Sequence, residues 1–162
     1  MALVKKQDLL ATGTAAADFR LPRLEAGEMT LHDITSQGPA LLAFFKVNCP
    51  VCQLTFPYLE RIHTQDRLPV YGISQNDSAE THAFNQRYGI TFPTLLDNED
   101  NGFAASNAFG ISTVPTIFLI ERDGTVSRVI EGWQKKEMQG LAEEAGIRPF
   151  LEGEAVPEWK AG

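Results

Sequence analysis

The chain has 162 residues, of which 43% are hydrophobic and 22% charged, a composition typical of one globular domain with a sizeable core. Its 21 acidic and 14 basic side chains give a formal charge of -7, which argues against nucleic acid or an anionic membrane as a partner, because both bind clustered Lys and Arg. No apolar run approaches the roughly 20 residues of a membrane-spanning helix, so no membrane partner is expected.

The N-terminal third predicts a hairpin and then a buried strand. Residues 1–15 are expected to form an irregular lead-in. Residues 18–21 and 29–32 alternate in polarity around a turn at residues 25–28, which indicates an N-terminal hairpin. Residues 40–46 form an apolar run without alternation, as a central strand covered by helices on both faces requires.

The middle of the chain predicts alternating helices and strands. Pro57 falls inside the first helix and should kink it, because proline lacks an N–H and crowds the preceding turn. Asp77, with Glu80 three residues later, is typical of a helix start, and Gly89 is typical of a helix end. The expected elements are a helix from Cys52 to His63, a strand at 69–74, a helix from Asp77 to Gly89, a short strand at 93–96 and a helix at 103–109.

The last third predicts a strand at 116–120, a turn at 122–124, a returning strand at 126–131 and a closing helix at 135–145. The tail, residues 148–162, is expected to be irregular, with Trp159 either pinned to the body or exposed. Strands that alternate with helices predict one α/β domain over residues 1–162, with a mainly parallel sheet and an antiparallel edge formed by the last hairpin.

Cys49-Pro50-Val51-Cys52 contains the only two cysteines of the chain, at the junction between a strand and a helix. In that setting a C-x-x-C pair is typical of a redox motif, because unpaired N–H groups at a helix N-terminus favour a thiolate over a thiol. Lowering a cysteine pKa from about 8.5 to about 7 needs only about 2 kcal/mol. Cys49 is therefore the candidate nucleophile, and Cys52 is its partner in a reversible disulfide.

Three other interpretations of the pair stay open. A structural zinc site needs four Cys or His ligands, and His32, His63 and His82 show no ligand spacing. A static disulfide across so short a loop would add little stability, and two unrelated buried cysteines would carry no chemistry. The redox pair is favoured, and neither a metal nor a cofactor is expected.

With Val114-Pro115-Thr116 opening a strand far downstream of the cysteine pair, the chain resembles the thioredoxin-fold proteins. The closer resemblance is to the TlpA/ResA-like branch of thiol–disulfide oxidoreductases, within the AhpC/TSA-related redoxin group that includes the peroxiredoxins. It implies an α/β thioredoxin-like fold: a mixed central sheet flanked by helices, an N-terminal hairpin extension and a central helix–strand insertion. The other matching segments are residues 17–22, 42–45, 49–52 with 56–57, 92–97, and 116–120 with 123–124.

The resemblance also implies a substrate-binding surface. In that family the proline corresponding to Pro115 is cis and packs against the cysteine pair, which would expose the backbone of Val114 to an extended client segment. Pro50 and Val51 complete the expected substrate contacts. An ordinary trans proline stays open, and Pro93 is the less suitable rival, because no strand–turn–strand–helix follows it. The expected partners are a disulfide-bearing protein and an unidentified electron donor.

The chain departs from the family pattern at three places near the cysteines. Asn48 stands where the family usually has Trp, and Ala43 stands where thioredoxin carries a carboxylate that relays protons. Gln53-Leu54-Thr55 lacks the charged residues often found after the motif. Lys46 and Asn48 are equally open to stabilising a Cys49 thiolate or to being solvated loop residues.

Three functions are consistent with these residues. The leading one is dithiol–disulfide exchange with partner proteins, most simply as a reductant. The second is a peroxiredoxin that forms a sulfenic acid on Cys49 and resolves it with Cys52, although Lys46 and Leu42 replace the Thr and Pro of that family. The third is a non-catalytic interaction module of the same fold.

Two further patterns concern location and metal binding. Residues 5–8 are polar where a signal peptide needs its apolar centre, so a cytoplasmic location is expected if Met1 is the native start. Residues 97–102 resemble a calcium loop only loosely, because the bidentate Glu at its end is missing. We expect a solvated turn there.

Overall fold

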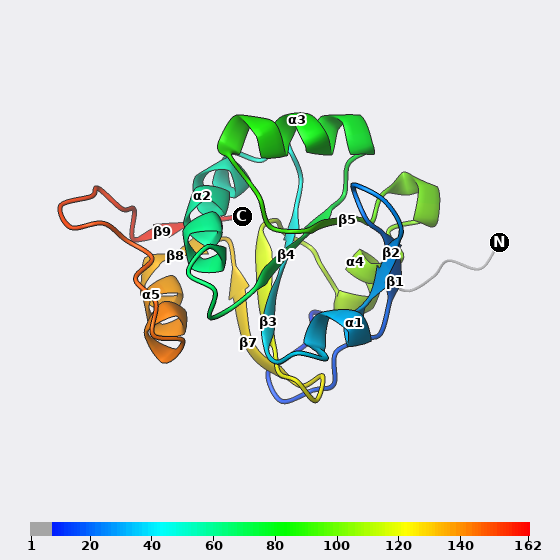
Figure 1. Ribbon diagram of the computed structural model, residues 1–162, viewed down its shortest axis with the longest axis horizontal. Coiled ribbons are helices and arrows are strands. Elements are labelled where there is room, and N and C mark those ends of the chain that lie inside the picture. The colour runs from blue at the N-terminus through cyan, green and yellow to red at the C-terminus, as the bar shows by residue number, and fades with distance from the viewer. Residues whose placement is uncertain (1–7) are drawn as a thin grey trace.

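A mixed five-stranded sheet forms the centre of the computed structural model, which describes residues 8–162 (Figure 1). In spatial order its strands are β5 (Thr94–Leu96), β4 (Val70–Ser74), β3 (Ala40–Phe45), β6 (Thr116–Ile120) and β7 (Val126–Glu131). β3 is parallel to β4 and β4 to β5, whereas β6 is antiparallel to both β3 and β7. The α/β fold with a mixed sheet is confirmed. The prediction of a mainly parallel sheet is wrong, because the antiparallel pairing reaches β3 in the middle.

Helices cover both faces of the sheet. One face carries α2 (Pro50–His63), α3 (Ser78–Tyr88) and α5 (Lys135–Glu144), and the other carries α1 (Leu31–Thr35) and α4 (Ala104–Phe109). The short elements are β1 (Arg20–Pro22), β2 (Glu28–Thr30), the 3₁₀ helix Glu99–Asn101, β8 (Trp133–Gln134) and β9 (Trp159–Lys160). None of the helices within residues 8–162 has the length and apolar character needed to cross a membrane.

β3 is buried along its whole length and supplies both halves of the core. Leu41, Ala43 and Phe45 pack under α2, while the alternate residues face α1 and α4, as the period of two along a strand requires. The ring centroids of Phe45 and Phe56 lie 4.3 Å apart, so the middle of α2 packs directly on the end of β3. α2 also continues through Pro57 without ending. This packing fixes the place where the cysteine pair stands.

The N-terminal hairpin forms as predicted, but its second arm is shorter. β1 and β2 pair antiparallel with Arg20 opposite Thr30, and the chain then turns into α1. The Thr30 hydroxyl accepts a bond from the Asp33 N–H, and the Asp33 carboxylate accepts one from the Thr30 N–H. This reciprocal cap starts a helix inside the predicted strand at residues 29–32, because it satisfies N–H groups that a helix end leaves unpaired.

α3 begins and ends where the sequence predicts. The Asp77 carboxylate accepts a bond of 2.8 Å from the Glu80 N–H, and Gly89 ends the helix in the left-handed conformation with φ 66°. The Glu80 carboxylate does not complete the reciprocal cap, because it accepts a bond from the Asn76 side chain instead.

At the two ends of the chain, the structure has a few backbone pairings within segments that were predicted to be irregular. Residues 1–7 of the predicted lead-in lie outside the described residues, and Ala15 bridges to Thr125. The tail at residues 148–162 is not wholly irregular, because β9 pairs antiparallel with β8. Its backbone N–H and C=O groups find partners on β8, which lies between the predicted strand at 126–131 and the predicted helix at 135–145.

The predicted solvated turn at residues 97–102 contains a buried carboxylate. Asp97 accepts bonds from the Ala105 N–H, from the Ser106 N–H and hydroxyl and from the Asn101 amide, over distances of 2.6 to 3.0 Å. The prediction of a solvated turn is wrong for Asp97, because its carboxylate caps α4 from inside the core. Across residues 8–162, the structure groups no three His, Cys, Asp or Glu side chains as a metal site would.

Candidate active site

Cys49 is the N-cap residue of α2. Its backbone is extended, with φ -91° and ψ 115°, and Pro50 occupies the first helical position, where its missing N–H costs nothing. The N–H of Cys52 donates to the Cys49 sulfur over 3.2 Å. The sulfur therefore takes the place that a Ser or Asp oxygen holds in an ordinary helix cap, at the positive end of a helix of 14 residues.

Two side chains hold the loop that leads from β3 to Cys49. The Val47 N–H donates to the Asn76 side-chain oxygen, and the Gln53 side chain donates to the Val47 carbonyl, both over 3.0 Å. Sequence reasoning missed both roles. Gln53 stands one turn beyond Cys49 on the same helix, which is a signal that could have placed it near the loop. Asn76 lies 29 residues from Val47 and offers no such signal.

The two sulfurs differ in exposure and in acidity. Cys52 is fully buried, whereas Cys49 is partly exposed, and both are free thiols. Hydrogen bonding from the Cys52 thiol, helped by the N–H groups of Cys52 and Val51, lowers the pKa of Cys49 to about 6 against the opposing effect of burial. Burial, together with the hydrogen bond to Cys49, raises the pKa of Cys52. At neutral pH roughly 90% of Cys49 is thiolate, while Cys52 keeps its proton.

Val114 and Pro115 lie directly beside the reactive sulfur. The peptide bond between them is cis, in agreement with the implication of the resemblance. The protonated Cys49 thiol donates to the Val114 carbonyl over 3.4 Å, across 65 residues of sequence. The fold thus brings Val114 beside the cysteine pair, although it lies 65 residues from Cys49 along the chain.

The other residues named near the pair have smaller parts. Pro50 is exposed at the rim, and Val51 is half-buried against the core and turns its N–H toward Cys49. The charge of Lys46 is the last of the influences that lower the pKa of Cys49, and Asn48 is an exposed loop residue. Ala43 is completely buried, so its position under the site holds a methyl group and supplies no proton relay.

Comparisons with known proteins agree with this geometry. The AhpC/TSA family matches residues 12–129. The thiol-disulfide oxidoreductase ResA of Geobacillus thermodenitrificans is 31% identical over 79% of this chain and 74% of its own length, and ResA of Geobacillus kaustophilus is 30% identical over the same shares. Among solved structures, a putative thiol:disulfide interchange protein DsbE from Chlorobium tepidum superposes with a TM-score of 0.73 at 23% identity, covering 84% of this chain and 95% of its own.

The solved structure and the ResA relatives establish different things. The solved structure shows the thioredoxin-like fold alone, because its identity is low. The ResA relatives confirm the predicted class of enzyme, a thioredoxin-like thiol–disulfide oxidoreductase. Because the AhpC/TSA family matches more than half of the residues of this chain, the chain belongs to that family.

Proposed function

We propose that Cys49 is the nucleophile of a dithiol–disulfide exchange with protein clients and that Cys52 resolves the mixed disulfide. The observation that carries this assignment is the contrast in exposure and pKa between the two neighbouring cysteine sulfurs. One caps a helix, is partly exposed and has a pKa of about 6, while the other is buried and protonated. A thiolate that clients can reach starts the reaction, and a protected thiol waits to finish it.

The reaction balances as a two-electron reduction of the client. The Cys49 thiolate attacks one sulfur of the client disulfide, so that a mixed disulfide forms and the other client sulfur leaves as a thiolate, which takes a proton from water. Cys52 then gives up its proton and attacks the Cys49 sulfur. The second client sulfur leaves and is protonated in turn. The client ends with two thiols, and Cys49 and Cys52 end as a disulfide that an external dithiol must reduce.

The mixed disulfide removes the negative charge that Cys52 stabilises. While Cys49 is a thiolate, it accepts the hydrogen bond of the Cys52 thiol, and this bond holds the proton on Cys52. Once Cys49 is bonded to the client, that acceptor is neutral and the proton is held less tightly. The structure supports a resolving step that becomes easier only after the client is captured.

We also propose that the client lies as an extended segment beside Val114, with Pro115, Pro50 and Val51 around it, and that the protein works as a reductant in the cytoplasm. Support for the client surface comes from the Val114 carbonyl, which is within 3.4 Å of the Cys49 sulfur. Thiols are kept reduced in the cytoplasm, and the pair would start there as a dithiol. Acid trapping of cell extracts, followed by alkylation, should then find mostly reduced Cys49 and Cys52.

Replacement of Cys52 by Ser tests the division of labour. This variant keeps the nucleophile and loses the resolving thiol, so covalent complexes with clients should accumulate. Dithiothreitol should reduce their mixed disulfide and release the client. The matched control is Cys49→Ser, which should trap nothing. Absence of complexes with Cys52→Ser, together with unchanged turnover, would contradict the scheme. Rapid sulfenylation of Cys49 with peroxide consumption would favour a peroxiredoxin instead.

A further inference from the structure

Residues 159–162 of the chain lie against the surface that the proposed function gives to the client. β9 pairs with β8 so that Lys160 stands opposite Trp133. Two residues later, a Cβ built on Gly162 would lie 2.7 Å from the Val114 carbonyl oxygen and 3.3 Å from the Cα of Gly132. The segment therefore reaches Val114 with its bare backbone, at a distance that leaves no space for another chain.

The carbonyl group that Gly162 approaches is the one that touches the reactive sulfur. The oxygen of Val114 lies 3.4 Å from the Cys49 sulfur, which donates to it when Cys49 is protonated. An extended client that pairs with the backbone of Val114 must occupy the volume beside this oxygen. Gly162 already holds part of that volume.

Gly132 shapes the body for this close approach. Its φ of 68° is in the left-handed region, and its N–H donates to the Pro115 carbonyl over 2.8 Å. A Cβ on Gly132 would lie 2.5 Å from the Lys160 carbonyl oxygen, which real contacts do not allow. Glycine is needed here both for the left-handed backbone and for the space that the segment fills.

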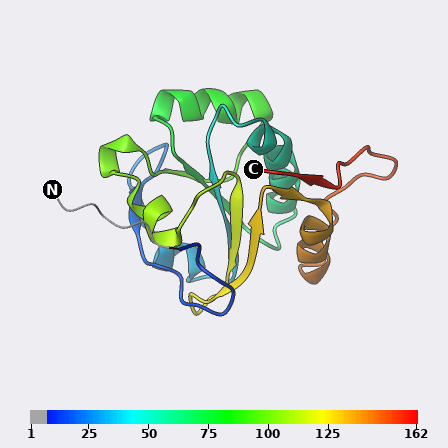
Figure 2. The same ribbon diagram turned by 180° about the vertical axis from the view of Figure 1, so that it is seen from behind.

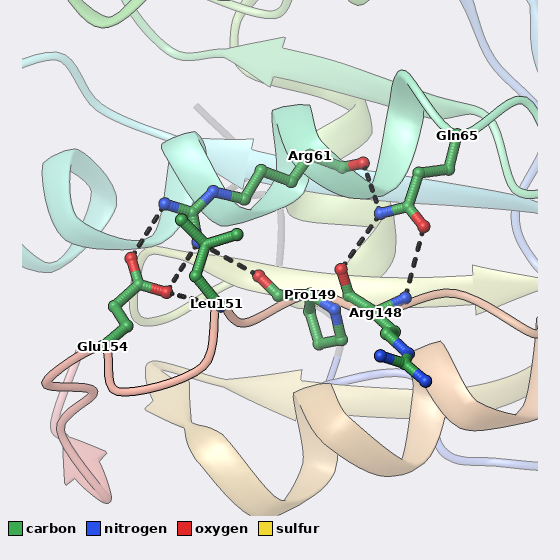
Figure 3. Close-up of polar contacts among 6 residues, drawn as sticks. All are labelled: Arg61, Gln65, Arg148, Pro149, Leu151 and Glu154. Carbon is green, nitrogen blue, oxygen red and sulfur yellow. Dashed lines mark hydrogen bonds and ion pairs between the residues drawn. The ribbon is translucent and has the colours of Figure 1, made fainter.

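The segment just before residues 159–162 is firmly attached. Arg61 of α2 makes two bonds of 2.7 and 2.8 Å to the Glu154 carboxylate and a third to the Pro149 carbonyl, and Gln65 bonds to the backbone of Arg148 (Figure 3). The indole N–H of Trp133 donates to the Pro157 carbonyl over 2.6 Å. Figure 2 shows the result: a projecting loop whose far end returns toward the body as β9.

Residues 159–162 are held less firmly than this anchor. Trp159 is 64% exposed and Lys160 is exposed, so neither side chain contributes much apolar burial. Their attachment consists of the two-residue pairing with β8 and of backbone contacts with Gly132 and Val114. A short strand without a buried face opens at low cost, because few contacts are lost.

We propose that residues 159–162 form an autoinhibitory strap, which occupies the backbone track beside Val114 and must leave before a protein client can pair there. The inference rests on the proposed function, because it assumes that clients use Val114. A small disulfide that needs only the Cys49 sulfur reacts without moving the strap. The anchor at residues 148–158 keeps the strap at high local concentration, so that it competes with every client.

The test compares two substrates in four proteins: the full chain, a deletion of residues 159–162, Gly162→Val and the control Ala155→Val. Valine at Gly162 pushes the strap off Val114 without touching the core, whereas Ala155 is exposed in the loop before it. The substrates are insulin, a protein disulfide, and 5,5′-dithiobis(2-nitrobenzoic acid), a small one. We expect kcat/KM with insulin to rise about tenfold on deletion and about threefold in Gly162→Val, with the small disulfide unchanged within twofold.

A peptide of residues 155–162, added to the deleted protein, should lower the insulin rate again and leave the small disulfide unaffected. Equal insulin rates in the full chain, the deletion and Gly162→Val, with normal reaction of the small disulfide, would overturn the strap and leave the proposed function intact. Failure of all four proteins to react with the small disulfide would overturn the proposed function itself.

Discussion

The junction that carries the cysteines and the tail at residues 148–162 meet at Val114, but different kinds of interaction build them. At the junction the bonds are mostly local: a sulfur that caps its own helix, a proline at the first helical position and a side chain one turn on. In the tail they are distant, since the Arg61–Glu154 pair joins residues 93 positions apart.

This difference means that the reactivity of Cys49 and the access of clients to Val114 depend on different bonds. Local bonds set the acidity of Cys49, because the Cys52 thiol and the N–H groups of Cys52 and Val51, which lower its pKa, all lie within three residues of it. Distant bonds set which backbone reaches Val114, because they depend on how the whole chain returns to α2 and β8. A protein built in this way can change its access control without changing the reactivity of its thiol.

Loss of the nucleophile should have the largest effect. In Cys49→Ser the hydroxyl can still accept the Cys52 N–H bond, so the helix start survives, but a serine is not ionised at neutral pH. We expect disulfide exchange to fall by at least about a thousandfold, measured as insulin reduction with dithiothreitol as the donor. Circular dichroism should stay unchanged. Residual activity above about a tenth of the full chain would show that another group starts the reaction.

Trp133 connects the two regions, and its removal should cost the most stability. The indole is fully buried, packs at a tilt against Tyr58 of α2 with ring centroids 4.9 Å apart, and donates to the Pro157 carbonyl of the tail. Trp133→Ala leaves a large cavity, so we expect the free energy of unfolding to fall by about 3–5 kcal/mol, measured by urea denaturation. The matched control is Trp159→Ala, which removes an exposed ring and should change stability by less than about 0.5 kcal/mol. Similar losses in both variants would contradict the division between core and strap.

The sequence predicts the junction well because its signals are local. A buried run followed by C-P-V-C places a strand, a turn and a helix start within a dozen residues, and each position has its own physical reason. Asp77 and Gly89 mark the bounds of α3 for the same reason. Even the missed helix α1 has a local cause, the reciprocal cap of Thr30 and Asp33, which the sequence at residues 30–33 could reveal.

The sequence does not predict contacts between residues that lie far apart along the chain. Nothing near Glu154 names Arg61 as its partner, and nothing near Lys160 indicates that it will pair with Trp133. Asp97 looks like part of a solvated acidic turn until α4 folds over it. Antiparallel pairing of β6 with β3 likewise follows from how the chain crosses the sheet, which hydrophobic periodicity does not encode.

The low pKa of Cys49 should be visible in the pH dependence of its alkylation rate, an effect smaller than the loss of the nucleophile. Alkylation by iodoacetamide requires the thiolate, so its rate should rise with pH through a midpoint of about 6, rather than about 8.5, because Cys49 has roughly thirtyfold more thiolate at pH 7 than an ordinary thiol. In Cys52→Ala the midpoint should move upward, because the largest cause of the low pKa is lost. An unchanged midpoint there would assign the acidity to the helix start alone.

The same pKa links the junction to stability. The folded pKa of Cys49 lies below its unfolded value of about 8.5, so the thiolate contributes stability fully above that value. The contribution is lost as the pH falls through about 6. Cys49→Ser should therefore remove a rise in stability between about pH 6 and about pH 8.5 that the full chain shows in urea denaturation.

The smallest expected effect lies in the anchor of the tail. Arg61→Gln removes the charge that pairs with Glu154, and amide hydrogen exchange at Leu151 and Glu154 should become about two- to fivefold faster, because an ion pair that keeps part of its surface in water stabilises only modestly. The control Arg20→Gln breaks an ion pair in the N-terminal hairpin and should leave the tail unchanged. Slow exchange in β3 should persist in both variants.

Low pH should weaken the Arg61–Glu154 pair in the full chain, as Arg61→Gln does at neutral pH. The Arg61 guanidinium lowers the pKa of Glu154 to about 2, below its unfolded value of about 4.3, so the anchor is fully formed above that value and is lost as the pH falls through about 2. Protection at Leu151 should therefore decrease between about pH 4 and about pH 2 in the full chain and show little of this pH dependence in Arg61→Gln. Loss of protection in β3 over the same interval would mean that the tail opens with the core, and the independence of the two regions would be disproved.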